Sequence, residues 1–158
     1  MSELNITDLA ILGIIQQGPI PLEKLIKVTK AMVPDLWYPT ADVIESSIRR
    51  NQADGFLYIH HQNPAHNFLN LTFEGAARLR LLMLYDPGQQ SSSNSRATEA
   101  LQFCLLDGSD PATTEHVLSR LRKRLHERKA DFEMRCVYCP NSNKYTRLWM
   151  DVEQQNLE

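Results

Sequence analysis

The sequence has little of what marks several large classes of protein. Only three of its 158 residues are cysteines, too few and odd in number for a disulfide scaffold, so a reduced, cytoplasmic protein is expected. The longest apolar runs, residues 9–15 and 81–85, are too short to cross a bilayer, and no basic segment precedes an apolar run near the N-terminus. A net charge of −2 excludes binding to any polyanion through bulk charge alone.

Motifs for catalysis and for cofactors are missing as well. There is no glycine-rich phosphate loop, no nucleophile elbow and no H-E-x-x-H pattern, so no enzyme activity and no cofactor are predicted. Cys136 and Cys139 form a C-x-x-C pair without the second pair that structural zinc needs. We interpret them as small side chains near a helix end, with a redox-sensing pair as the alternative, and we predict no metal site.

What is present divides the chain in two. Hydrophobic residues make up 42% and charged residues 23%, as in a globular protein. Residues 87–98 are polar, rich in serine and turn-forming, and are predicted to be a linker. The expected organisation is therefore one compact unit over residues 1–86 and a helical segment over residues 99–158.

The first unit follows the order of a winged helix-turn-helix. Helical patterns occupy residues 6–15, 22–32, 40–53 and 73–84, and strand patterns occupy residues 56–59 and 68–73. Residues 60–67 between the strands are expected to form a polar hairpin tip. On the third helix, Val43, Ile44 and Ile48 are expected to face inward. Few small folds place a hairpin directly after a third helix, so the predicted fold is mainly α with a small β-hairpin wing.

The second unit is predicted to hold a homodimer together. A short helix over residues 96–106 is followed by a long helix after Pro111 and a last helix from about residue 144. Apolar residues on these helices form narrow stripes that one helix cannot bury alone. They need each other, the first unit or a second copy of the chain, and a second copy is the most economical answer. The expected dimerisation residues are Leu101, Leu105, Leu118, Leu121, Leu125, Phe132, Tyr145, Leu148 and Trp149.

Four stretches, taken in order, resemble the PadR-like family of transcriptional regulators. Residues 11–15 with Gly18 and Pro19 are similar to the family's opening helix and turn, and residues 44–57 are similar to its recognition helix and first wing strand. Residues 69–75 look like the end of its wing, and residues 101–125 resemble its dimerisation region. The resemblance implies a homodimeric regulator of transcription, more often a repressor, whose affinity for double-stranded DNA is modulated through the dimer interface. A small-molecule effector is a possible partner of that interface, with aromatic side chains such as Trp37 as candidate lining.

A helix in the major groove needs hydrogen-bonding side chains for base edges and basic side chains for phosphates. The candidate DNA-binding residues are Lys24, Lys27, Lys30, Tyr38, Thr40, Ser46, Ser47, Arg49, Arg50, His60, His61 and His66.

The same region also departs from the family pattern. Glu45 stands where the family has tyrosine, the wing carries histidines in place of arginine or lysine, and residues 1–88 hold seven basic against nine acidic side chains. The alternative is therefore a winged-helix module that binds another protein and no longer reads DNA.

Overall fold

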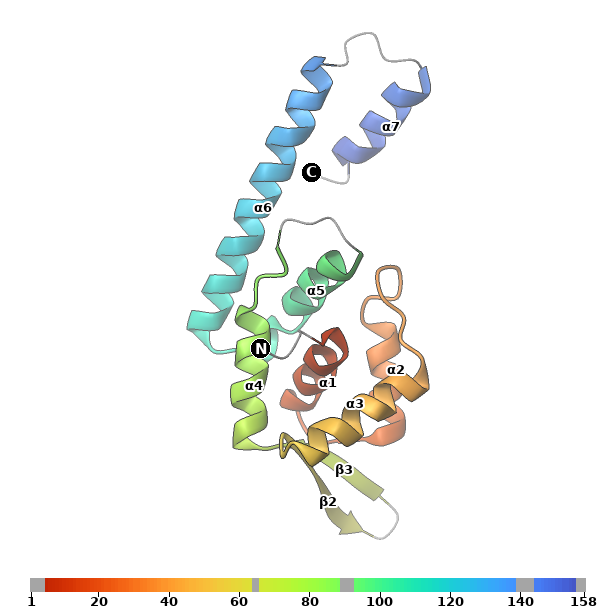
Figure 1. Cartoon of the computed structure of the whole chain (residues 1–158), viewed down its shortest axis with the longest axis vertical. Helices are drawn as coiled ribbons and strands as arrows, with labels where there is room; N and C mark the ends of the chain where they lie inside the picture. Colours follow the sequence, from red (N-terminus) through yellow and green to blue (C-terminus); the bar gives the residue numbers. More distant parts are fainter. Residues whose placement is uncertain (1–4, 64–65, 89–92, 139–143, 156–158) are drawn as a thin grey trace. The chain divides into compact units, whose positions relative to one another are not determined.

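The computed structural model describes residues 5–63, 66–88, 93–138 and 144–155, and it divides the chain into two compact units, Met1–Val117 and Leu118–Glu158. Figure 1 shows the elements in chain order. They are α1 (Ile6–Gln16), β1 (Ile20–Pro21), α2 (Leu22–Ala31), α3 (Ala41–Ala53), β2 (Leu57–Asn63), β3 (His66–Leu71), α4 (Phe73–Leu84), α5 (Ser93–Cys104), a 3-10 turn η1 (Leu106–Gly108), α6 (Pro111–Tyr138) and α7 (Lys144–Gln155). The predicted class, mainly helical with a small β wing, is confirmed.

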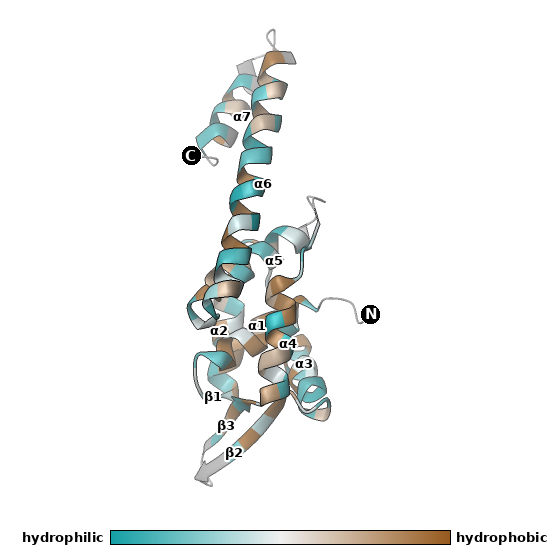
Figure 2. Cartoon of the chain, turned by 90° about the vertical axis from the view of Figure 1, so that its left-hand side faces the viewer, coloured by the Kyte–Doolittle hydropathy of each residue, from teal (hydrophilic) through white to brown (hydrophobic). Residues whose placement is uncertain are grey.

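Helix α1 is the centre of the first unit. Asn5 caps it by accepting a hydrogen bond from the backbone N–H of Thr7, and the helix is buried along residues 7–15. Leu9, Ile11 and Leu12 are fully enclosed, because α2, α3, α4 and α5 all pack against this helix. Figure 2 shows the hydrophobic residues gathered there. Burial of each such side chain contributes about 1.5–3 kcal/mol to folding.

Helices α2 and α3 form the helix-turn-helix. Thr40 caps α3 by accepting a hydrogen bond from the backbone N–H of Val43. The buried face of α3 consists of Ile44, Ser47, Ile48 and Asn51. The prediction that Val43 faces inward was wrong, since its side chain is 48% exposed. The helical period explains the difference, because positions 44, 47, 48 and 51 share one face and position 43 lies beside it.

The wing is part of a three-stranded antiparallel sheet in the order β1-β3-β2. The short strand β1, which the sequence pattern did not predict, pairs Ile20 with Leu69 and so attaches the wing to the segment after α1. Strand β2 pairs with β3 from Leu57 opposite Leu71 out to residue 63 opposite residue 66. The strands thus extend into the segment expected to be a hairpin tip, because a ladder can continue through polar residues whose backbone groups are paired.

The base of the wing is joined to the start of α4. Thr72 donates its hydroxyl hydrogen to the carbonyl of Gly55 at 2.7 Å and accepts from the N–H of Gly75 at 2.9 Å. Its own N–H donates to the carbonyl of Phe56 at 3.1 Å. A Cβ atom on Gly75 would lie 2.1 Å from that carbonyl oxygen, so only glycine fits there. The hydrogen bonds of Thr72 therefore connect the segment after α3 to the end of the wing.

Helix α5 belongs to the first unit. It begins at Ser93, inside the segment predicted to be a linker, and the division between units falls after Val117. Gln102 is fully buried and donates its amide to the carbonyls of Leu82 and Tyr85 at 3.0 and 2.9 Å. These carbonyls belong to the last turn of α4 and to its C-cap residue Tyr85, where helices leave acceptors without partners. The boundary predicted from composition therefore lies too early in the chain. The segment is polar on average because only one side of α5 is apolar, and that side packs against α1.

Helix α6 spans 28 residues and continues from the first unit into the second, which also contains α7. Figure 2 shows hydrophilic residues along most of α6, with hydrophobic ones at intervals. Within the second unit Phe132 is buried and contacts the guanidinium of Arg135 at 5.9 Å from the ring centre. Among the described helices, none combines the length and the hydrophobicity needed to cross a membrane.

Candidate nucleic-acid interface

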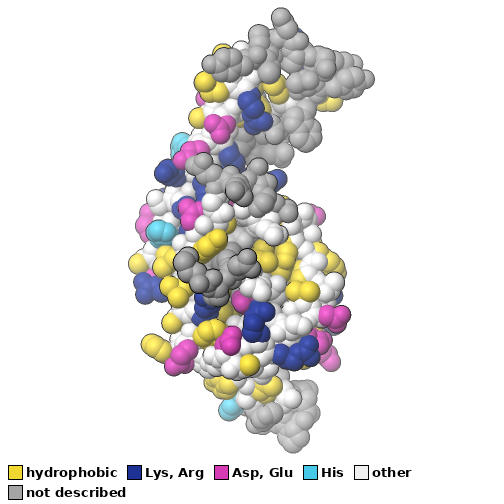
Figure 3. All heavy atoms as spheres, in the orientation of Figure 1, with side chains coloured by type: hydrophobic (Ala, Val, Ile, Leu, Met, Phe, Trp, Pro, Cys, Tyr) yellow, Lys and Arg dark blue, Asp and Glu magenta, His cyan; other side chains and the backbone are white. Residues whose placement is uncertain are grey.

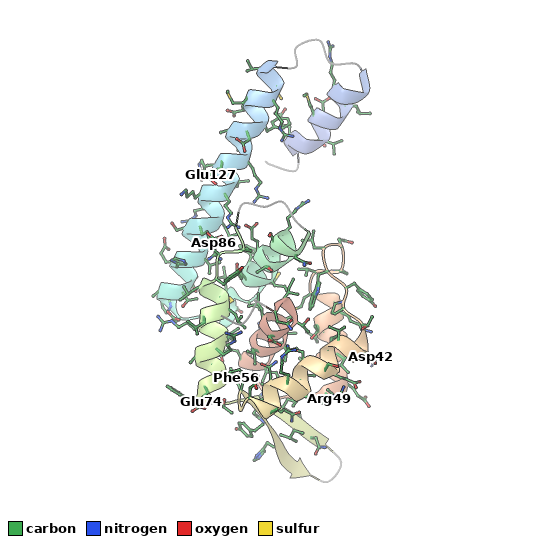
Figure 4. The ribbon with its side chains drawn as sticks, in the orientation of Figure 1. Asp42, Arg49, Phe56, Glu74, Asp86 and Glu127 are labelled. Carbon is green, nitrogen blue, oxygen red and sulfur yellow. The ribbon has the colours of Figure 1, made fainter. Side chains whose placement is uncertain are left out.

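The exposed face of α3 is the candidate reading surface. Its solvent-facing residues recur at helical spacing and are Asp42, Val43, Ser46, Arg49, Arg50 and Ala53. Figure 4 shows Asp42 and Arg49 projecting from α3 away from α1. Arg49 lies 3.4 Å from the hydroxyl of Ser46, one turn earlier on the same face. This row offers a cation, a hydroxyl, a carboxylate and an apolar side chain, the groups that distinguish base edges in a major groove.

Two candidate residues on α3 are tied to the interior. Ser47 is 2% exposed and donates its hydroxyl hydrogen to the carboxylate of Asp8 on α1, so the expectation that it contacts DNA is corrected by its burial. Arg50 forms an ion pair with the same carboxylate. Its Nη2 lies 2.5 Å from Oδ1 of Asp8, and its side chain is 47% exposed. Asn51 donates its amide to Asp8 at 2.8 Å. The polar positions of α3 therefore serve two faces, one exposed and one buried.

Residues before α3 supply further polar and basic groups. Lys24 and Lys27 are exposed on α2, and Lys30 at its end lies 5.7 Å from the centre of the Tyr38 ring. This cation–π contact joins α2 to the loop that leads into α3. Tyr38 is exposed, and Thr40 is exposed while its hydroxyl caps the helix. Lys30 thus lies beside the loop that precedes α3 and supplies a basic group of the kind that contacts phosphates.

The wing contributes no lysine or arginine, because residues 56–72 contain neither. His60 on β2 is exposed, whereas the side chains of His61 and His66 lie outside the described part of the structure. The exposed wing residues close to its base are instead apolar, namely Tyr58 and Ile59 on β2. On the face in Figure 3, basic and acidic side chains are interspersed over the described surface and form no continuous basic field.

The predicted dimerisation residues fall into two groups. Leu101 and Leu105 are buried inside the first unit, and a Cβ on Gly13 of α1 would meet the Leu105 side chain at 2.4 Å. The expectation that these two leucines join two chains is corrected, since they leave no surface for a partner. Leu118 and Leu121 are half-buried, Phe132 is buried, and Leu125 and Leu148 are exposed. The side chains of Tyr145 and Trp149 lie outside the described residues.

The cysteines and histidines are not assembled into a metal site in the part of the chain that the structure describes. Cys104 is exposed on α5 and Cys136 is half-buried on α6, while Cys139 lies outside the described residues.

Sequence reasoning missed the buried partner of the recognition helix. Asp8 lies in the first turn of α1, and its side chain is 9% exposed and accepts three hydrogen bonds from α3. A signal was available. Asp8 interrupts an otherwise apolar stretch, and the period of Ile44 and Ile48 places Ser47 and Asn51 on their face. A polar side chain at a buried position is expected to form a hydrogen bond with another buried polar group.

The element order and the exposed third helix define a winged helix-turn-helix protein.

No protein-family model and no curated protein matches the chain. Several solved structures, in contrast, match most of the chain. That of Bacillus subtilis PadR in complex with operator DNA matches with a TM-score of 0.50 and 12% identity, covering 90% of this chain and 80% of that one. The same protein in complex with p-coumaric acid matches with a TM-score of 0.49 and 11% identity, covering 99% and 90%. A PadR-like transcriptional regulator from Bacillus cereus matches with a TM-score of 0.47 and 13% identity, covering 96% and 88%. The first likeness shows that this chain has the PadR fold.

Proposed function

We propose that this protein is a sequence-specific DNA-binding regulator of transcription that acts as a homodimer, as a repressor, in the cytoplasm and without enzymatic activity. The observation that carries the proposal is the exposed row on α3, where Val43, Ser46 and Arg49 share one face at helical spacing. In this fold the recognition helix enters the major groove, and residues near its N-terminal end reach the base edges.

Each side chain of the row has a distinct expected contact. Arg49 is suited to the O6 and N7 acceptors of guanine, the commonest specific contact in protein–DNA complexes. Val43 offers an apolar surface for a thymine methyl group, and Ser46 pairs with either a donor or an acceptor. Lys24, Lys27, Lys30, Tyr38, Thr40 and His60 are proposed to touch the backbone around this helix.

Dimerisation is proposed to occur through the second unit. Leu125, Met134 and Val137 on α6 and Leu148 and Val152 on α7 are apolar and exposed in the single chain. Burial of this surface against a second copy would remove it from water. The two recognition helices would then read half-sites about 34 Å apart, one helical turn of DNA. A small molecule bound at that interface would change the spacing of the helices and hence the affinity.

The test is fluorescence anisotropy with a labelled duplex from the gene's own upstream region and a scrambled duplex of equal length, each at low and at physiological salt. We expect the wild type to prefer the native duplex, and Arg49→Ala to lose about 5- to 150-fold in affinity for it, equivalent to roughly 1–3 kcal/mol for a base contact. Arg96→Ala, an exposed arginine on α5, is the matched control and should change little. Equal binding of both duplexes by the wild type would contradict the proposal.

A second candidate function is a protein-binding winged helix, and a specific observation favours it. Tyr58 and Ile59 on the wing and Phe73 at the start of α4 are exposed, with Phe73 85% accessible, on a wing without a lysine or arginine. Exposed aromatic side chains are typical anchors of protein interfaces. If Arg49→Ala leaves regulation in the cell unchanged while Phe73→Ser abolishes it, this second function is the better description.

A further inference from the structure

A single buried carboxylate connects α1 to the helix proposed to read DNA. Asp8 lies in the apolar helix α1, and its Oδ1 accepts hydrogen bonds from Ser47, from Arg50 at 2.5 Å and from Asn51 at 2.8 Å. Asn51 also donates to the backbone carbonyl of Ser47 at 2.8 Å, which holds its amide in place. Figure 1 shows α1 and α3 as neighbouring helices, and they pack directly against each other.

The three donors occupy one turn of α3. Residues 47, 50 and 51 are spaced by three and four positions, which brings their side chains to the same side of the helix. A carboxylate removed from water destabilises the fold unless its charge is balanced and its oxygens are hydrogen-bonded. The guanidinium of Arg50 balances the charge, while the hydroxyl of Ser47 and the amide of Asn51 complete the shell around one oxygen.

The contact differs in kind from the apolar packing around it. Ile44 and Ile48 on the same face of α3 are buried, but apolar contacts are non-directional and tolerate small rotations of a helix. Hydrogen bonds are directional and weaken steeply when their angles change. Three of them converging on one atom fix both the rotation of α3 about its axis and its position along α1.

We propose that Asp8 is a positioning residue for the recognition helix, and that Arg50 acts as the counter-ion of Asp8 and makes no contact with DNA. This inference rests on the proposed function. A binding site works only when its side chains are held within about 0.5 Å and 10–20° of the productive geometry. The Asp8 contact sets that geometry for Val43, Ser46 and Arg49, which lie on the exposed side of α3 next to the buried face.

Asp8→Asn tests the positioning role, because asparagine has the shape of aspartate and lacks its charge. We expect the ratio of affinities for the native and scrambled duplexes to fall at least 10-fold. Affinity for the scrambled duplex and its salt dependence should stay within about 2-fold, because non-specific binding rests on phosphate contacts that Asp8 does not make. Asp107→Asn, which removes an exposed carboxylate from η1, is the matched control and should preserve the ratio. A ratio unchanged in folded Asp8→Asn protein would overturn the proposal.

Amide hydrogen exchange gives a readout that does not depend on DNA. In Asp8→Asn, the amides of α3 should exchange at least 10-fold faster while those of α4 keep their wild-type rates, since α4 has no part in the contact. A uniform increase in all helices, or none, would refute the positioning role. If the wild type fails to distinguish the two duplexes, the proposed function fails, and the exchange experiment still decides the role of Asp8.

Arg50→Met tests the second half of the proposal. Methionine keeps most of the arginine stem and removes the charge, so Asp8 loses its counter-ion. We expect the duplex preference to fall, the salt slope of binding to stay at the wild-type value, and Asp8→Asn in the same chain to recover part of the preference. A salt slope lower by about one, as for a lost phosphate contact, would show that Arg50 binds DNA and would overturn this assignment.

Discussion

Replacement of Gln102 by methionine tests whether α5 is an integral part of the first unit. Gln102 has no exposed surface, and its amide donates to two carbonyls at the end of α4 at 3.0 and 2.9 Å. Methionine has nearly the same volume and retains the packing, so the substitution isolates the hydrogen bonds. Each hydrogen bond contributes about 1 kcal/mol, and leaving the buried Leu82 carbonyl without this donor adds about 1–2 kcal/mol. We expect the free energy of unfolding to fall by roughly 3–4 kcal/mol.

The measurement is urea denaturation followed by circular dichroism at a fixed protein concentration, since association changes apparent stability. Gln16→Met on α1 is the control, because Gln16 is exposed and the same change there should cost less than about 0.5 kcal/mol. The m-value should stay constant, which would show that the change acts on the folded state. A loss below about 0.5 kcal/mol for Gln102→Met would refute the reasoning that these hydrogen bonds make α5 an integral part of the first unit.

Three further predictions follow from the site and its supports. Gly75→Ala places a Cβ 2.1 Å from the Phe56 carbonyl oxygen, so it should lower the unfolding free energy by about 1–3 kcal/mol in the same urea assay, whereas Ala77→Gly on the exposed side of α4 should cost less than about 1 kcal/mol. If Val43 contacts a thymine methyl, Val43→Ser should weaken binding of the native duplex about 5-fold and leave the scrambled duplex unaffected in anisotropy titrations. A hydrogen bond from the Thr113 side chain lowers the pKa of Asp110 at the start of α6, so its ionised form stabilises the fold above the unfolded pKa of about 4 and that contribution disappears as the pH falls through the lower folded value. The stability advantage of wild type over Asp110→Ala should therefore be larger at pH 6 than at pH 2.5, and an equal advantage at both would contradict the assignment.

Local signals predicted most of the elements correctly. Thr40 and Thr72 cap α3 and α4 because a hydroxyl before a helix satisfies the free N–H groups of its first turn, which is a property of a few consecutive residues. The same holds for the end of α3 at residues 54–55, where Gly55 has a positive φ of 78°. The change from a helical to a strand period after residue 56 placed the wing, and with it the winged helix-turn-helix class.

Contacts between distant residues could not be read in this way. The strand β1 has only two residues and exists because β3 offers it a partner, so its own sequence carries no signal. The predicted boundary between the units was misplaced because composition shows only how polar a segment is. Whether α5 belongs to the first unit depends instead on which neighbouring helix covers its few apolar residues. Leu101 and Leu105 accordingly proved to be core residues of the first unit and not part of a dimer seam.

The sequence by itself determined the helices, their caps, the wing and the polar character of α3, because each depends on interactions within a few residues. Only the tertiary structure decided which polar side chains of α3 are available to a partner. Ser46 and Arg49 face solvent, while Ser47 and Asn51, only one or two positions away, are buried against Asp8, some 40 residues earlier in the chain. A rotation of about 100° per residue separates the two faces, and only the packing of α3 against α1 selects which one remains exposed.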